Sequence, residues 1–153
     1  MKLFFQSVIT VLLSTFLLGQ DLVLAQSGAD EIVGTWLVPE KDGKIEVYKK
    51  GDTYFGKIVW ISEPNNADGT PRKDIYNEDT ALRNQPIVGL VVLRDFKYDA
   101  KSKEWTGGTV YNSRSGKTYS GYLKLQEDGS LYLKGYIAGM RWLGKSNVWT
   151  RVN

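Results

Sequence analysis

The sequence contains no cysteine and no histidine. Without cysteine the chain forms no disulfide, so the folded state depends on its hydrophobic core, and no thiol is present for lipid attachment. Without histidine it lacks the general base of Ser-His-Asp and Cys-His catalysis and the usual nitrogen ligand of zinc. It also lacks the side chain that titrates near neutral pH. These two absences exclude several classes of enzyme and of metal protein.

An excess of one charge sign is also missing. The chain has 20 Lys and Arg against 17 Asp and Glu, a net charge of +3 at pH 7. Acidic and basic residues alternate along the chain, as in residues 41–46. A nucleic-acid-binding protein presents a clustered basic face, so we expect no nucleic-acid partner.

One long apolar run is present, at residues 3–18, after the positively charged start Met1-Lys2. The small-residue pattern Val23-Leu24-Ala25 before Gln26 resembles a signal-peptidase cleavage site. A transmembrane anchor is the alternative, but the run is interrupted by polar residues and is shorter than the roughly 20 residues that span a bilayer. We therefore predict a signal peptide over residues 1–25 and one domain over residues 26–153. We expect the protein in the periplasm or secreted, with no stable membrane anchor after cleavage.

Short β-rich runs separated by turn residues fill the rest of the chain. Their spacing of roughly 8–12 residues is typical of a sandwich or a barrel. Turn sequences such as Asp128-Gly129 favour tight hairpins between sequential strands. We predict eight strands, at residues 32–38, 44–50, 53–61, 88–98, 104–112, 117–126, 130–137 and 141–151.

Eight strands linked by hairpins form an up-and-down meander. When the meander closes into a barrel, its first and last strands pair and no edge strand remains. The fold class is therefore all-β, an eight-stranded antiparallel barrel. Alternation around the Asp128-Gly129 turn separates two faces. The face expected inside the barrel consists of Leu123, Leu125, Leu131, Leu133 and Ile137, and the outer face carries Tyr122, Tyr132 and Tyr136.

The segment of residues 62–86 breaks this rhythm, because it is polar and holds three of the four prolines. Loops of this length are uncommon unless they are functional or disordered. We predict a helical turn over residues 78–83 capped by Asn77. Asp79 and Arg83 have the spacing of a helical ion pair. Asn77, Asp79 and Arg83 either stabilise the loop or form a polar binding site at the barrel mouth. In the second case Arg83 would bind a carboxylate or phosphate through two hydrogen bonds.

Four further side chains are candidates for the interior or its entrance. If Ile58 and Trp60 point inward, then Lys57 faces solvent, whereas the opposite register buries Lys57 as a cation in need of a partner. Tyr111 and Tyr119 are expected to line the interior, as is Trp105. Aromatic side chains inside small barrels fill the core more often than they stack on ligands.

Gly34-Thr35-Trp36 on the first strand and Arg151 on the last resemble the signature of the calycins, which include lipocalins, fatty-acid-binding proteins and avidins. The resemblance implies that Arg151 packs over the Trp36 ring and closes the barrel floor.

Nine short stretches spread over nearly the whole domain carry a second resemblance. They are IVGTW (32–36), YFGKIVW (54–60), NEDTALRN (77–84), PIVGL (86–90), FKY (96–98), GGTVY (107–111), GKTY (116–119), GYI (135–137) and WTR (149–151). In these stretches the chain resembles the exported proteins of domain-of-unknown-function family 2147, which are widespread in Gram-negative bacteria. The resemblance implies a calycin-like barrel and no established activity. Glu78 departs from the family pattern, since a proline usually stands at that position.

We expect a protein that binds a small apolar or amphipathic ligand in the barrel mouth, with residues 62–86 as a lid. The alternative is a packed, ligand-free barrel that docks a protein or envelope partner through its outer tyrosines. No constellation of residues meets the criteria for acid–base or nucleophilic catalysis, so no enzyme activity and no cofactor are expected. The ligand-binding candidates are Asn77, Asp79, Arg83, Lys57, Trp60, Tyr111 and Tyr119.

Export tests the predicted signal peptide. When the chain is expressed in a Gram-negative host, the intact mass of the periplasmic protein should correspond to residues 26–153. Recovery of the full-length chain from the membrane fraction would contradict cleavage after Ala25.

Overall fold

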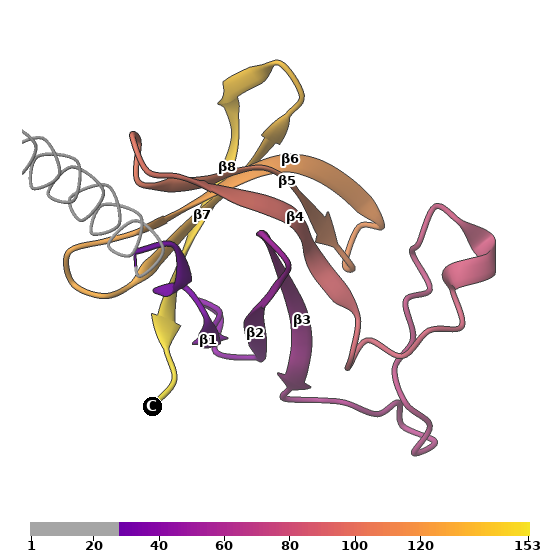
Figure 1. The fold of residues 1–153 in the computed structure, drawn as a ribbon. Coiled ribbons are helices and arrows are strands. Elements are labelled where there is room, and N and C mark those ends of the chain that lie inside the picture. The colour runs from indigo at the N-terminus through magenta and orange to yellow at the C-terminus, as the bar shows by residue number, and fades with distance from the viewer. Residues whose placement is uncertain (1–27) are drawn as a thin grey trace, which may run out of the picture. The chain divides into compact units, whose positions relative to one another are not determined.

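Eight antiparallel strands follow one another around a closed barrel in a computed structural model that describes residues 28–153 (Figure 1). The predicted signal peptide lies outside the described residues. The chain divides into units of residues 1–31 and 32–153, and the barrel lies in the second. The strands are β1 (Gly34–Leu37), β2 (Gly43–Lys50), β3 (Thr53–Ile61), β4 (Val91–Asp99), β5 (Glu104–Asn112), β6 (Lys117–Leu125), β7 (Leu131–Ile137) and β8 (Met140–Arg151).

These strands confirm the fold class and most of the predicted strand bounds. The largest shift is in β4, which begins at Val91 rather than at residue 88. Gly89 has a φ of +97°, and the amide of Leu90 donates to the carbonyl oxygen of Ile87 at 3.2 Å. A local turn therefore precedes the strand. No helix within the described residues has the length and apolarity that a bilayer crossing needs.

The barrel closes between its first and last strands. Trp36 pairs with Arg151 and Leu37 with Thr150. The Arg151 guanidinium carbon lies 4.2 Å from the centre of the Trp36 ring, and Arg151 donates to the carbonyl oxygen of Val33 at 3.0 Å. A side chain on Gly34 would approach Arg151 to 2.7 Å, so the glycine leaves room for this cation–π contact. The expected stacking of Arg151 on Trp36 is confirmed.

Large aromatic side chains fill the barrel interior. Trp36, Tyr54, Phe96 and Trp105 are each at most 2% exposed. Tyr54 and Trp105 meet edge to face, with ring centres 6.3 Å apart. The inward prediction for Trp105 is therefore confirmed, and most of the barrel is a packed core rather than a tunnel.

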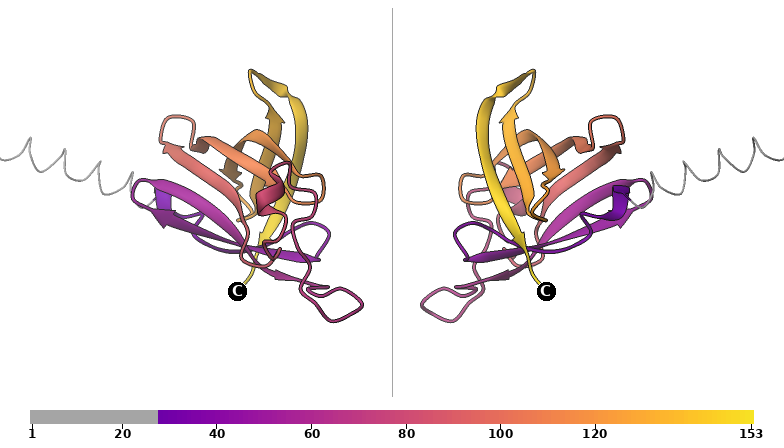
Figure 2. Two further views of the ribbon diagram at one scale, coloured as in Figure 1. Left: turned by 90° about the vertical axis from the view of Figure 1, so that its right-hand side faces the viewer. Right: turned by 90° about the vertical axis from the view of Figure 1, so that its left-hand side faces the viewer.

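The hairpin of β6 and β7 follows the predicted alternation at most positions. Leu123, Leu131 and Leu133 are buried, while Leu125 is half-buried. Ile137 is 48% exposed, because it lies where the β7–β8 hairpin stands clear of the rest of the barrel (Figure 2). The prediction that Ile137 belongs to the inner face is therefore wrong.

A substitution at Gly108 tests the tight interior. A Cβ atom there would lie 2.5 Å from both the Phe96 ring and the carbonyl oxygen of Arg94. Gly108→Ala should therefore lower the free energy of unfolding by about 1–3 kcal/mol, measured by urea denaturation. Gly135→Ala is the matched control, since the nearest atom to its Cβ is 3.7 Å away. An equal effect of the two substitutions would contradict the close packing at Gly108.

Candidate functional site

A cavity of about 820 Å³ lies at one end of the barrel, against the long segment of residues 62–86. Its lining comes from the β1–β2 turn, the adjoining ends of β2 and β3, the long segment and the β5–β6 turn. Its volume falls within the range of roughly 300–1,000 Å³ that is usual for small-molecule sites. The barrel mouth is therefore hollow, although the barrel below it is packed.

The inner side of this cavity is apolar. Ile45 and Ile58 pair across β2 and β3, and their side chains are 5% and 7% exposed. Val38 and Ile61 extend the apolar lining toward the rim. An apolar group that enters the cavity thus meets aliphatic side chains, and its burial is favourable.

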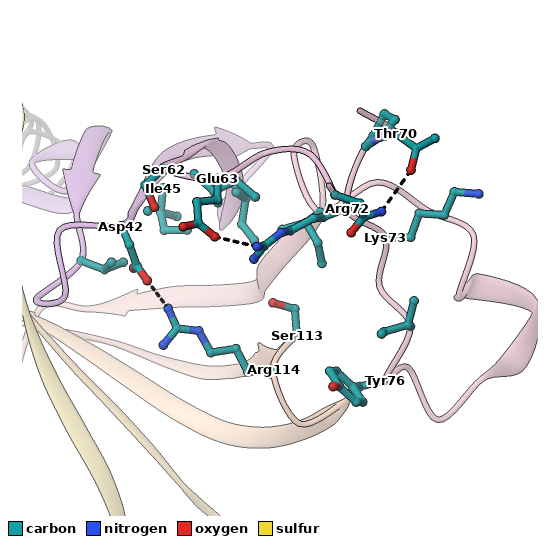
Figure 3. Close-up of a pocket in the computed structure, with 18 residues that line it drawn as sticks. Asp42, Ile45, Ser62, Glu63, Thr70, Arg72, Lys73, Tyr76, Ser113 and Arg114 are labelled. Atoms are coloured by element: carbon teal, nitrogen blue, oxygen red, sulfur yellow. Dashed lines mark hydrogen bonds and ion pairs between the residues drawn. The ribbon is translucent and has the colours of Figure 1, made fainter. Parts of the chain in front are cut away.

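The rim carries two arginines, each paired with an acid (Figure 3). Arg114 on the β5–β6 turn donates to Asp42 on the β1–β2 turn at 2.7 Å. Arg72 donates to Glu63 at 2.6 Å within the long segment. Both pairs are exposed, and exposed ion pairs contribute only about 0–1 kcal/mol to stability. An anionic ligand group can therefore replace either acid at little cost.

The long segment is held against the barrel by a fully buried carboxylate, that of Asp74. The hydroxyl of Tyr111 on β5 donates to both oxygens of this carboxylate, at 2.7 and 2.8 Å. The Asn77 side-chain amide donates to it at 2.7 Å. The Asp74 amide in turn donates to the carbonyl oxygen of Gln85 at 2.9 Å, which closes the segment on itself. One acid thus fixes the segment that forms a wall of the cavity.

A second contact between backbones reinforces this anchor. Gly116 in the β5–β6 turn has a φ of +73°, and a Cβ atom there would collide with the carbonyl oxygen of Tyr76. Only glycine permits both this conformation and this approach. Because Arg114 belongs to the same turn, the contact also sets the position of one rim arginine.

Burial and the neighbouring Asp74 carboxylate raise the pKa of Tyr111 to about 12. Burial is the larger cause, and the hydrogen bond to Asp74 adds to it. Both disfavour a phenolate next to an existing negative charge. Tyr111 is therefore a neutral donor throughout the physiological pH range.

The three candidates on the long segment brace it and do not line the cavity. Asp79, not Asn77, caps the short 3-10 helix η1 (Thr80–Leu82) by accepting from the Ala81 amide at 2.9 Å. Asn77 accepts from the Asp79 amide at 3.0 Å, which forms a turn before the helix. Arg83 donates to the carbonyl oxygen of Asn77 at 2.7 Å, and the described contacts include no ion pair with Asp79.

The two candidates on β3 face outward. Lys57 bonds to Glu46 at 2.9 Å and lies over the Tyr48 ring, as the outward register predicts. The inward prediction for Trp60 is wrong, since its side chain is 41% exposed and lies under the Lys44 ammonium group. The cause is a bulge, because Ile58 pairs with Ile45 but Trp60 pairs with Lys44. The extra residue, Val59, turns the following side chain to the other face.

The two candidate tyrosines point to opposite faces of the sheet. The register pairs Val110 with Leu93 and Tyr119, so Tyr119 lies on the inner face near the open end of the barrel. Tyr111, the next residue along β5, points to the opposite side and reaches Asp74. The prediction that Tyr111 lines the interior is therefore wrong, and its role is to anchor the long segment.

Sequence reasoning missed the residues that line the cavity. None of the seven candidates belongs to its lining. The polar rim instead consists chiefly of Asp42, Glu63, Arg72 and Arg114, with Tyr76 beside them. Each of these residues is an ordinary turn or loop residue in the sequence. The one available signal was their position, since Asp42 and Arg114 occupy turns at the same end of an up-and-down barrel as the long segment.

Comparisons with known proteins agree with this architecture. A bacterial family model described as "Uncharacterized protein conserved in bacteria (DUF2147)" matches residues 34–151. A solved structure of the protein HP1028 from Helicobacter pylori, described as belonging to the lipocalin family, is similar with a TM-score of 0.69 and 23% identity. The similarity covers 80% of this chain and 83% of that one, and it shows a lipocalin-like fold. No curated protein matches the chain.

Replacing Tyr111 tests the anchor. Tyr111→Phe leaves a buried carboxylate with one fewer donor and should cost about 1–3 kcal/mol of stability at neutral pH, measured by urea unfolding. Tyr119→Phe is the matched control, because the described residues give the Tyr119 hydroxyl no hydrogen bond and its loss should cost less.

The difference in stability between the wild type and Tyr111→Phe should also depend on pH. The folded-state pKa of Tyr111 is raised above the ordinary value of 10.0, so its contribution to stability is complete below pH 10. That contribution is lost as the pH rises toward about 12. The difference in stability between the wild type and Tyr111→Phe should therefore shrink above pH 10. A difference that grows with pH would contradict the assigned hydrogen bond.

Proposed function

The chain belongs to the bacterial family of uncharacterised proteins DUF2147, and we propose that it binds a small amphipathic molecule in the cavity at the barrel mouth. Its lipocalin-like fold supports a binding role, because small barrels of this type hold ligands at their open ends. We further propose that the protein acts after export, in the periplasm or outside the cell. The apolar run at residues 3–18 and the cleavage pattern at Ala25 support this location.

The observation that carries the proposal is the polarity gradient across the cavity. Ile45 and Ile58 form an apolar inner side, and Arg72 and Arg114 stand at the rim. A ligand with an apolar body and an anionic group matches both ends of this gradient. The guanidinium groups offer two parallel donors to a carboxylate or phosphate, which fixes the orientation of the bound molecule.

The packed interior limits how the ligand lies. Trp36, Phe96 and Trp105 are buried within the barrel, and Leu93 occupies the space above Gly56. The apolar part of the ligand therefore stops at Ile45 and Ile58. The proposed ligand is a compact molecule at the mouth rather than a long chain threaded through the barrel.

The bonds made by the acidic side chains near the cavity favour binding over catalysis. The Asp74 carboxylate is fully buried and accepts bonds from Tyr111 and Asn77. Asp42 and Glu63 are paired with the rim arginines. A general acid or base must reach its substrate with an available proton site, and the buried Asp74 carboxylate is committed to its structural bonds.

A packed interaction barrel is the second candidate function. Tyr122 contacts both Tyr132 and Tyr136 on the outer face, with ring centres 5.9 and 6.3 Å apart. Aromatic side chains are enriched at protein interfaces, so this cluster supports docking of a partner. The presence or absence of a molecule in the mouth distinguishes the two functions.

Native mass spectrometry tests the proposal on protein purified gently from a Gram-negative periplasm. We expect a discrete additional mass that is lost on denaturation. Replacing both Arg72 and Arg114 with Gln should lower occupancy at least about tenfold, because hydrogen bonds to charged groups contribute about 1.5–3 kcal/mol each.

Arg94→Gln is the matched control, since Arg94 is an exposed arginine on β4 outside the cavity. Its occupancy should equal that of the wild type. A bare protein mass that persists with lipid and metabolite extracts present would reject ligand binding and favour the interaction barrel.

A further inference from the structure

The hairpin of β7 and β8 stands clear of the rest of the barrel in every view (Figures 1 and 2). From Arg141 to Val148 each residue of β8 is exposed, with no alternation between buried and exposed positions. Successive side chains of a strand point to opposite faces, so both faces of the hairpin meet solvent here. A projecting ribbon of this kind buries little surface within its own domain.

One edge of the hairpin is also unpaired within the described structure. β8 pairs with β7 from Trp149 back to Met140, but it pairs with β1 only at Thr150 and Arg151. The backbone of residues 141–148 therefore presents donors and acceptors along that edge. Natural proteins often protect such edges with charged side chains, and Lys145 lies within this one.

Apolar side chains gather where the hairpin projects. Trp142 is 77% exposed, Leu143 is 50% exposed and Ile137 is 48% exposed. Trp142 and Leu143 are consecutive in β8, so they point to opposite faces, and each face of the projecting hairpin carries an exposed apolar side chain.

The charged side chains of the hairpin segment itself have one sign. Residues 129–153 contain no Asp and no Glu, whereas they contain Lys134, Arg141, Lys145 and Arg151. The net charge of the entire chain is only +3, so its positive charge is concentrated in this segment. Arg141 bonds to Glu104 of β5 at 2.6 Å, but the described structure gives Lys134 and Lys145 no ion pair.

This combination identifies the kind of partner. A second copy paired through the open edge of β8 would add its own Arg141 and Lys145 to the same ribbon, and like charges at short range are unfavourable. A surface of negative charge that accepts Trp and Leu side chains satisfies both features. The interface of a bilayer that contains anionic phospholipids has these properties, because Trp and Tyr favour the headgroup level and Lys pairs with lipid phosphates.

We propose that the β7–β8 hairpin docks the protein reversibly on an anionic phospholipid surface. Trp142 and Leu143 enter the interface, while Lys134 and Lys145 contact phosphate groups. The unpaired edge of β8 needs water or headgroup partners, so the hairpin lies at the headgroup level and does not enter the hydrocarbon core.

The topology relates the position of the β7–β8 hairpin to the barrel mouth. In an up-and-down barrel the turns alternate between the two ends, so the β7–β8 turn lies at the same end as the β1–β2 and β5–β6 turns. Those two turns border the cavity. The docking hairpin and the cavity therefore belong to the same end of the barrel. Docking does not depend on the cavity being occupied, and vesicle binding is measured separately from ligand mass.

Vesicle flotation tests the proposal with exported protein whose intact mass shows that residues 1–25 are absent. The vesicles contain either phosphatidylcholine alone or an equimolar mixture of phosphatidylcholine and phosphatidylglycerol. We expect binding to the mixed vesicles and a weakening of that binding by salt. Trp142→Gln should reduce the partition coefficient about tenfold, since binding scales with the apolar area buried. Replacing Lys134 and Lys145 with Gln should reduce it about fivefold for each lysine.

The control replaces Lys50 and Lys101 with Gln, two exposed lysines at the β2–β3 and β4–β5 turns of the other end. This variant should bind as the wild type does. Equal binding to both kinds of vesicle, no binding, or an unchanged Trp142→Gln variant would overturn the proposal. A concentration-dependent dimer that Trp142→Gln abolishes, without vesicle binding, would also overturn it and identify a second copy as the partner.

Discussion

The arrangement of the mouth depends on one buried charge, the carboxylate of Asp74. Burying a carboxylate is costly unless donors surround it, and here Tyr111 and Asn77 supply them. Because Tyr111 belongs to the barrel and Asp74 to the segment of residues 62–86, these bonds tie a long connection to a rigid sheet. The cavity wall is therefore a fixed element of the structure, and the segment that looked like a lid in the sequence is docked.

Side chains fill the barrel interior but leave a cavity at its mouth. The interior is filled by large aromatic side chains, and inward glycines such as Gly56 and Gly108 leave the space that Leu93 and Phe96 occupy. The mouth is lined by smaller aliphatic residues and by loops whose arginines have exposed partners. In this lipocalin-like barrel the cavity lies at one end, and that position supports the proposal of a compact amphipathic ligand.

The strands were predictable because their signals are local. Alternation and turn residues act over a few positions, and the contact between Arg151 and Trp36 was implied by the resemblance at the two ends of the chain. Trp60 was misplaced because the bulge at Val59 reverses alternation without a marker in the sequence. The cavity was missed because it depends on contacts between distant segments. Tyr111 and Asp74 are 37 positions apart, and Arg114 and Asp42 are 72 positions apart.

Amide hydrogen exchange of the segment of residues 62–86 tests the central claim most directly. The account predicts that the amides of Asp74 and Ile87, which donate to Gln85 and Arg72, are protected in the wild-type protein. In Tyr111→Phe these amides should exchange faster while those of β4 and β5 keep their protection. Rapid exchange of the segment in the wild type, or unchanged protection in the variant, would show that Asp74 does not hold the cavity wall.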